Sequence, residues 1–170
     1  MEYLQLFDEN GTKLDEKIAR DNKKEIKPGK YFMIVLIIIE NDNHEFLMQV
    51  TSEEKGHELA LTGGYVQYGS DGITTCIKEV KEELGLDLKK EEILSLGLIK
   101  GKAVLVSVYY IKKNVDTSNL ILQKSEVESI RWVSMEEIEA LINDGSLRNT
   151  NIPAFEKLNE FKTKQELLNK

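Results

Sequence analysis

The hydrophobic residues of this chain form short continuous runs in some segments and follow a helical spacing in others. Residues 31–40 make the longest run, and its many β-branched side chains predict a central strand that is buried on both faces. Shorter runs at 3–7, 45–50 and 127–133 are bounded by polar turns and predict further strands. Residues 93–111 predict two more strands, separated by a polar turn. We therefore expect a sheet built around residues 31–40.

The spacing changes in the middle of the chain, where apolar residues recur every three or four positions. This period places four side chains on one stripe of a helix: Ile73, Ile77, Val80 and Leu84. Gly85 follows directly, where a left-handed cap is favoured, and Ser70 or Asp71 is suited to cap the start. Two later helices are expected. One begins at the capping box Ser134–Glu137, and the other is an amphipathic segment over Pro153–Leu168.

Strands and helices are interleaved over a length that suits one domain. A chain of 170 residues is long enough for a single sizeable core, and it contains no internal repeat or low-complexity linker. This order predicts an α+β fold in which helices sandwich a sheet. Residues 1–27 are expected to form an N-terminal hairpin extension, and residues 151–170 the C-terminal helix.

Three carboxylates lie beside the apolar stripe of the first helix. Glu79, Glu82 and Glu83 fall within an arc of roughly 100°. Like charges at such spacings repel each other by roughly 0.2–0.5 kcal/mol per pair, and a cation held among them would remove that cost. The simpler interpretation is a solvated helix face on which Lys78 pairs with Glu82. The glycine turn expected at residues 63–64 favours a metal site instead.

Residues 63–86 resemble the signature box of the Nudix hydrolases. That box reads Gly, five residues, Glu, seven residues, then Arg-Glu-hydrophobic-any-Glu-Glu-any-Gly-hydrophobic, and here it begins at Gly64. Seven of its nine defining positions match; Ser70 replaces the first Glu and Lys78 replaces the Arg. Lys keeps the positive charge but loses the planar fork of donors. The two departures leave two outcomes open: either they compensate each other or they reduce activity, and Asp71 is a candidate substitute for the missing carboxylate.

The resemblance extends over most of the chain. Residues 2–11, 28–31 and 46–49 resemble the Nudix subgroup related to isopentenyl diphosphate isomerase, and residues 126–134 resemble the usual end of a Nudix domain. It implies a single Nudix domain over residues 1–170, with a mixed β-sheet in an α/β/α sandwich.

The resemblance also implies a reaction. Glu79, Glu82 and Glu83 would serve catalysis and bind Mg²⁺ or Mn²⁺, since such hard cations prefer oxygen ligands. The bound metal would neutralise the substrate's oxygens and lower the pKa of a water. The implied activity is hydrolysis of the phosphoanhydride bond in a nucleoside diphosphate linked to another moiety.

Four residues outside the carboxylate trio complete the implied site. The backbone carbonyl of Gly63 would be a metal ligand, and Glu126 is a further candidate ligand whose alternative is a simple surface position. Gly64 and Tyr65 would contact the substrate, because glycine lets a phosphate approach the backbone closely. Tyr65 could stack on a base or sugar, or it could pack on a face of the sheet.

Two other functions are considered. A catalytically weak Nudix module that binds a nucleotide or a protein partner as a sensor is motivated by Ser70 and Lys78. An isopentenyl diphosphate isomerase is disfavoured, because that family carries a catalytic Cys and a metal-binding His where this chain has residues 63–66, which contain neither.

The composition limits the kinds of partner that we expect for this chain. The formal net charge is -7 and no dense basic tract is present, which argues against a nucleic-acid partner. Cys76 is the only cysteine, which excludes an intrachain disulfide and points to the cytoplasm. The apolar run at 33–39 is too short to span a bilayer, and residues 1–10 show no signal peptide, so no membrane partner is expected. The sequence leaves both a monomer and a homodimer open.

Overall fold

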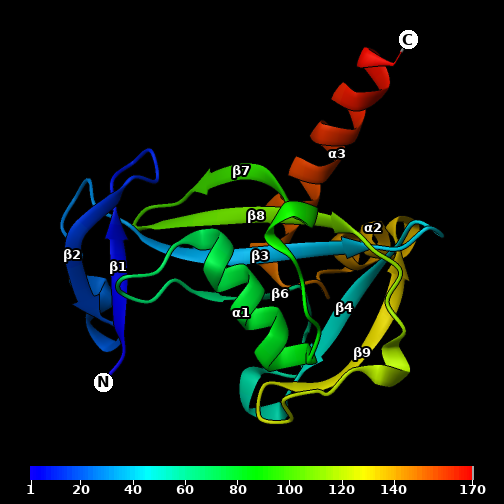
Figure 1. Cartoon of the computed structure of the whole chain (residues 1–170), viewed down its shortest axis with the longest axis horizontal. Coiled ribbons are helices and arrows are strands. Elements are labelled where there is room, and N and C mark those ends of the chain that lie inside the picture. Colours follow the sequence, from blue (N-terminus) through cyan, green and yellow to red (C-terminus); the bar gives the residue numbers. More distant parts are fainter. Residues whose placement is uncertain (170) are drawn as a thin grey trace.

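The β-branched run is the axis of a mixed sheet in the computed structural model, which describes residues 1–169 (Figure 1). The strands are β1 (Tyr3–Phe7), β2 (Lys13–Ala19), β3 (Phe32–Glu40), β4 (Glu45–Thr51), β5 (Leu59–Ala60), β6 (Thr62–Tyr65), β7 (Leu94–Lys100), β8 (Val104–Lys112) and β9 (Val127–Ser134). The helices are α1 (Gly72–Leu84), α2 (Met135–Asp144) and α3 (Ile152–Leu168).

Strand β3 has different neighbours on its two sides. It pairs in parallel with β8 along its whole length, and β7 pairs antiparallel with β8 at the edge. On the other side β3 pairs antiparallel with β6, whereas β4 keeps only the Glu40–Phe46 pair with β3 and then pairs with β9 and β5. Strands β4 and β9 therefore lead away from β3, as Figure 1 shows.

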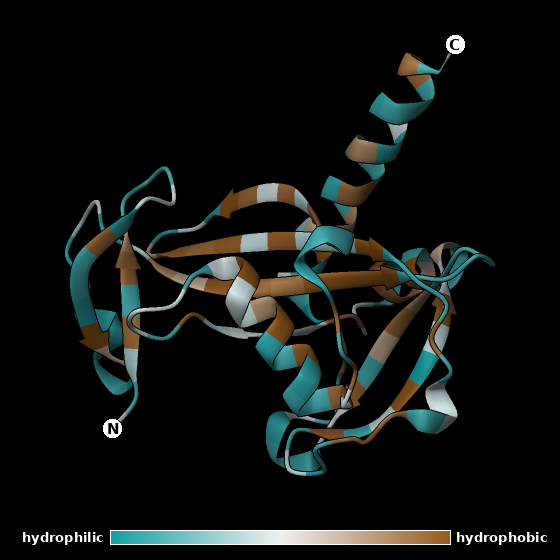
Figure 2. Ribbon diagram, viewed as in Figure 1, coloured by the Kyte–Doolittle hydropathy of each residue, from teal (hydrophilic) through white to brown (hydrophobic). Residues whose placement is uncertain are grey.

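Helices cover both faces of this seven-stranded sheet. Alternate residues of β3 point to opposite faces, so Val35 and Ile37 join the cluster that contains α1, while Leu36 and Ile38 join the cluster that contains α2 and α3. Figure 2 shows the hydrophobic colouring concentrated in β3 and β8, the two central strands. The expected α+β sandwich with a mixed sheet is confirmed.

Helix α1 begins and ends where its capping residues predict. The Asp71 carboxylate accepts a hydrogen bond from the Thr74 amide at 2.9 Å, so Asp71 is the N-cap. The hydroxyl of Ser70 lies 3.4 Å from that of Thr75. Gly85 has the left-handed φ of 69° expected of a C-terminal cap.

Strands β1 and β2 form a separate two-stranded sheet, followed by a short 3-10 helix over Arg20–Glu25. We call residues 1–25 the N-terminal hairpin. It contacts the rest of the molecule through isolated bridges from Leu4 to Gln67 and from Phe7 to Tyr31, two residues that flank strands of the main sheet. These contacts bring the start of the chain beside the segment between β6 and α1 (Figure 1).

The last helix differs from its prediction. Its first half buries Ala154, Phe155 and Leu158, but Leu167 and Leu168 are exposed, and the end of α3 points away from the sheet in Figure 1. The expectation of an amphipathic helix over its full length is therefore wrong, because the sheet ends before the helix does. Within residues 1–169, no helix has the length and apolarity needed to cross a membrane.

Candidate active site

A cleft of about 500 Å³ opens beside β6. Its walls come from β3, β4, β6 and α1, from the N-terminal hairpin, and from the loops that precede β9 and α3. Every residue that the sequence suggested for the site lines this cleft: Gly63, Gly64, Tyr65, Glu79, Glu82, Glu83 and Glu126. The structure thus brings together residues from a strand, a helix and a distant loop.

The three carboxylates of α1 differ in burial. Glu82 is exposed, Glu79 is half-buried, and Glu83 is only 6% exposed. A solvated helix face does not account for a buried Glu83. Its Oε1 accepts a long hydrogen bond of 3.4 Å from Nε2 of Gln49, and its Oε2 has no hydrogen-bond partner in the described part of the chain.

Burial and crowding shift the titration of these groups. Burial raises the pKa of the Glu83 carboxyl to about 8, and the negative charge of Glu79 adds to the rise. Burial also raises the pKa of Glu79, with a further contribution from the charge of Glu82. The charge of Glu126, which lines the same cleft, acts in the same direction on the pKa of Glu79 and of Glu83.

The two glycines lie in strand β6 and not in the expected turn. Gly63 pairs with Leu36 and Gly64 with Val35, so the backbone continues the sheet at this point. A Cβ atom at Gly64 would lie 2.5 Å from Cδ of Glu79. The prediction of a turn is therefore wrong: the second glycine provides room for a carboxylate rather than a change of chain direction.

The donor set suits a hard divalent cation. Among residues 1–169, no three His, Cys, Asp or Glu side chains are already arranged to hold a metal ion. The Glu82 carboxylate lies 3.9 Å from Nζ of Lys78. However, Oε2 of Glu83 is a buried carboxyl oxygen without a hydrogen-bond partner in the described residues, and a cation beside it would favour ionisation of this carboxyl. Carboxylate oxygens on neighbouring turns of one helix provide the ligand type that Mg²⁺ and Mn²⁺ prefer.

The two departures from the box have their own contacts. The Lys78 amino group donates a hydrogen bond of 3.4 Å to Oε1 of Gln67, besides its ion pair with Glu82. Asp71, the candidate substitute for the missing carboxylate, is engaged as the cap of α1. Lys78 thus contacts Gln67, which follows β6, and Glu82 on α1. Neither of these contacts involves residue 70 or 71.

Glu126 is positioned by contacts on the far side of the cleft. Nζ of Lys55 lies 3.5 Å from its Oε1, and its carbonyl accepts a hydrogen bond of 3.0 Å from the Ser52 amide. Glu126 therefore belongs to a wall formed by the loops after β4 and before β9. Its carboxylate faces a cation there and is half-buried.

Tyr65 packs against other side chains within the cleft. The guanidinium of Arg20 lies over its ring, 4.3 Å from the centroid, and the ring of Phe32 lies 5.8 Å away in a tilted arrangement. These contacts agree with the interpretation that Tyr65 packs against the sheet. They also show that a cation, Arg20, stacks on its ring.

Several cleft residues were missed by the sequence reasoning. Gln49 stood inside a segment that resembled the family, and its contact with Glu83 required the fold to become visible. Arg148 forms an ion pair of 2.7 Å with Glu58, and Arg20 comes from the N-terminal hairpin. Neither arginine is marked by a local pattern, because each reaches the cleft only through tertiary packing.

The sequence matches a known domain family and individual relatives within it. The NUDIX domain matches residues 30–155. The chain is 28% identical over 150 residues to an uncharacterized Nudix hydrolase of Listeria innocua, a match that covers 85% of this chain and 87% of the relative. An uncharacterized Nudix hydrolase of Clostridium acetobutylicum is 24% identical over 163 residues, which cover 84% of this chain and 75% of the relative.

Solved structures share the fold. A protein from Deinococcus radiodurans superposes with a TM-score of 0.72 at 18% identity, covering 93% of this chain and 98% of the other. The MutT protein of Methanosarcina mazei superposes with a TM-score of 0.64 at 24% identity, covering 80% of this chain and 96% of the other. Since the domain match spans most of the sequence and includes the cleft carboxylates, this chain belongs to the Nudix hydrolase family.

Proposed function

We propose that the protein is a metal-dependent hydrolase that cleaves the phosphoanhydride bond of a nucleoside diphosphate linked to another moiety. The observation that carries this proposal is Glu83, a buried carboxylate with an unpartnered oxygen in a cleft that also holds Glu79 and Glu82. Burial and the neighbouring Glu79 disfavour ionisation of Glu83, and a divalent cation is the partner that would stabilise its carboxylate form.

The ligands would come from α1 and β6. Glu82, Glu83 and the carbonyl of Gly63 would hold Mg²⁺ or Mn²⁺, with Glu126 as a further ligand from the opposite wall. When bound, the cation would neutralise the diphosphate oxygens and lower the pKa of a water. Gly64 and Tyr65 would form the wall along which the substrate lies.

Glu79 is the residue best suited to orient the attacking water. It lies against Gly64, which limits where its carboxylate can move. The water oxygen would attack phosphorus while its proton passes to Glu79, and the anhydride oxygen would leave with the electron pair of the broken bond. Burial raises the pKa of Glu79 in the metal-free cleft, which favours its role as a proton acceptor there.

The test is turnover of a panel of nucleotides and nucleotide sugars with Mg²⁺ or Mn²⁺, measured as release of phosphate or of the nucleoside monophosphate. We expect Glu82→Gln and Glu83→Gln each to reduce kcat by about 100-fold or more. Glu91→Gln, an exposed Glu outside the cleft, is the matched control and should retain full activity. Full activity in both cleft variants would refute the proposal.

A second function is favoured by Ser70 and Lys78, which replace the Glu and Arg of the family's box. A protein with weakened catalysis could bind a nucleotide as a sensor. Metal-dependent binding of panel members without turnover would support this function, and robust turnover would exclude it.

A further inference from the structure

The N-terminal hairpin contributes to the cleft although it lies before the matched region, which begins at residue 30. Glu2 and Arg20 both line the cleft together with the carboxylates of α1. Arg20 is therefore a cation on the same cavity wall as Tyr65, and it is supplied by a part of the chain outside the matched domain.

Arg20 makes two contacts, of which the stacking on Tyr65 sets the plane of its guanidinium. Its guanidinium stacks over the Tyr65 ring at 4.3 Å, and its Nη1 donates a hydrogen bond of 2.9 Å to Oε2 of Glu2. A guanidinium has five N–H donors in a rigid plane, and the Glu2 contact uses one of its nitrogen atoms. A plane fixed in this way suits recognition of a phosphate or another multidentate anion.

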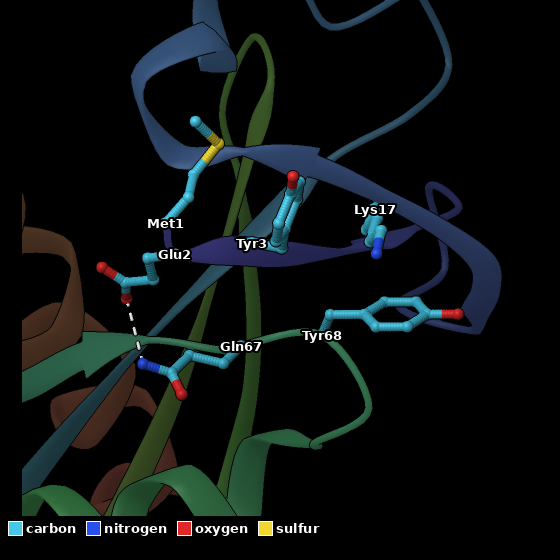
Figure 3. Close-up of a pocket in the computed structure, with 6 residues that line it drawn as sticks. All are labelled: Met1, Glu2, Tyr3, Lys17, Gln67 and Tyr68. Atoms are coloured by element: carbon cyan, nitrogen blue, oxygen red, sulfur yellow. Dashed lines mark hydrogen bonds between the residues drawn. The ribbon is translucent and has the colours of Figure 1, made fainter.

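A chain of polar contacts connects this guanidinium to α1. Figure 3 shows the Glu2 carboxylate facing the side-chain amide of Gln67, whose Nε2 donates to Glu2 Oε1 at 3.1 Å. Gln67 in turn accepts the hydrogen bond from Lys78, and Lys78 pairs with Glu82. The position of Arg20 is thereby linked to a carboxylate of the proposed metal site.

The Glu2–Arg20 pair is poorly suited to be a structural clamp. The two side chains are 32% and 40% exposed, and exposed ion pairs add little to stability. Backbone hydrogen bonds already attach the hairpin to the body: Gln5 donates to Val66, and Phe7 donates to Tyr31. A pair that is exposed to the cleft, and whose cation is aligned by an aromatic ring, is better suited to bind a ligand.

We propose that Arg20 binds an anionic oxygen of the substrate's phosphate chain, and that Glu2 occupies the guanidinium when no substrate is present. The proposal rests on the proposed function for the kind of ligand. It adds a binding residue from the hairpin and gives Glu2 the role of an internal competitor. The hairpin is accordingly part of the substrate site.

The experiment measures binding of methylenediphosphonate, a diphosphate analogue with a non-hydrolysable bridge, by calorimetry in the presence of Mg²⁺. Arg20→Gln should weaken binding by about 10- to 100-fold, the effect of one charge-assisted hydrogen bond. Arg20→Lys should restore part of the loss, because it keeps the charge without the fork. Glu2→Gln should tighten binding by up to about fivefold, since it removes a weak exposed competitor.

Lys17→Gln is the matched control on the same hairpin. Its amino group lies 4.3 Å from the Tyr3 ring centroid and 5.2 Å from that of Tyr68, in a neighbouring surface pocket shown in Figure 3, which shares Glu2 with the cleft but does not include Arg20. Loss of this cation should leave the affinity unchanged. An equal loss in Lys17→Gln and Arg20→Gln would overturn the proposal, since only the net charge of the hairpin would then matter.

Two further results would also overturn it: wild-type affinity in Arg20→Gln, or weakening in Glu2→Gln as large as in Arg20→Gln, which would make the pair a structural clamp. If Arg20→Gln does not fold by thermal melting, Glu2→Gln and Arg20→Lys still decide the matter. If the proposed function is wrong, the wild-type protein will turn over no member of the panel, but binding of the analogue will still depend on Arg20. The two proposals therefore fail in different measurements.

Discussion

Glu79 lies so close to Gly64 that a Cβ atom at position 64 would be 2.5 Å from Glu79 Cδ and 2.6 Å from its Oε1. Gly64 has no left-handed φ, so its importance lies in the space it leaves and not in its backbone conformation. The strand and the helix can therefore approach closely only while residue 64 lacks a side chain, and that approach places the Glu79 carboxylate beside the cleft.

Gly64→Ala should displace the Glu79 carboxylate and lower kcat by about 100-fold, because a misplacement of about 1 Å can have that effect. Gly69→Ala is the control: it introduces strain at a φ of +88°, but no atom lies within 4 Å of the new Cβ. It should lower the melting temperature and leave kcat unchanged. Similar kcat values in Gly64→Ala and the wild type would show that Glu79 tolerates the shift.

Gln49→Met should make Glu83 harder to ionise. The hydrogen bond from Gln49 lowers the pKa of Glu83, so its removal should raise that pKa further above about 8. At pH 7 we expect Mn²⁺ binding to weaken by up to about tenfold, since one pKa unit corresponds to a tenfold change. The difference from the wild type should shrink at pH 9, where Glu83 is mostly ionised in the wild type and about half ionised in the variant even after a rise of one pKa unit.

Calorimetric titration with Mn²⁺ at the two pH values checks this expectation, with Gln165→Met on the exposed end of α3 as a control. A loss of affinity that is equally large at pH 7 and pH 9 would show that Gln49 does not act through the proton of Glu83.

The stability of the metal-free protein should fall as the pH rises. The pKa of Glu83 is about 8 in the folded protein against an ordinary value of 4.5, so the folded state binds its proton more tightly than the unfolded state. The favourable contribution is complete below about pH 4.5 and is lost as the pH rises through about 8. The slope is at most about 1.4 kcal/mol per pH unit.

Thermal melting in EDTA between pH 5 and pH 9 measures this loss as the difference between the wild type and Glu83→Gln. The variant should show a smaller decline, because it has no carboxyl group to ionise. At pH 8.5, Mg²⁺ should raise the melting temperature of the wild type more than that of the variant. Parallel curves for the two proteins would contradict the assignment.

The sequence predicted the features that depend on neighbours in the chain. The buried run of β3 and the caps of α1 are local patterns, and both are found in the structure. Gly63–Gly64 were expected to form a turn, because a glycine pair gives no local sign that room is needed for a helix packed across it. The last helix was expected to be amphipathic over its full length, because periodicity does not reveal where the sheet stops.

The residues of the candidate site also form two groups: those that the sequence predicted and those that only the folded structure reveals. The carboxylates of α1 lie on one helix, so their spacing in the sequence was enough to predict that they lie side by side. The stacking of Arg20 on Tyr65 joins a hairpin to the main sheet, and the contact of Gln49 with Glu83 joins a strand to a helix. Such pairs are set by tertiary packing, which leaves no periodic trace in the chain.

The departures at Ser70 and Lys78 allow a test of how fast this site works. Lys78 reaches Gln67 and Glu82, whereas a Glu at position 70 facing an Arg at position 78 could form a bidentate pair with defined geometry. Such a pair would hold the loop before α1 against the helix that carries Glu79. The double variant Ser70→Glu/Lys78→Arg should therefore raise kcat by about 2- to 10-fold, with a coupling between the two sites of at least about 0.5 kcal/mol.

A double-mutant cycle on kcat measures that coupling, with the exposed Lys81→Arg as a control for an added guanidinium on α1. If the effects of the single variants multiply without coupling, residues 70 and 78 do not act as a pair in this protein.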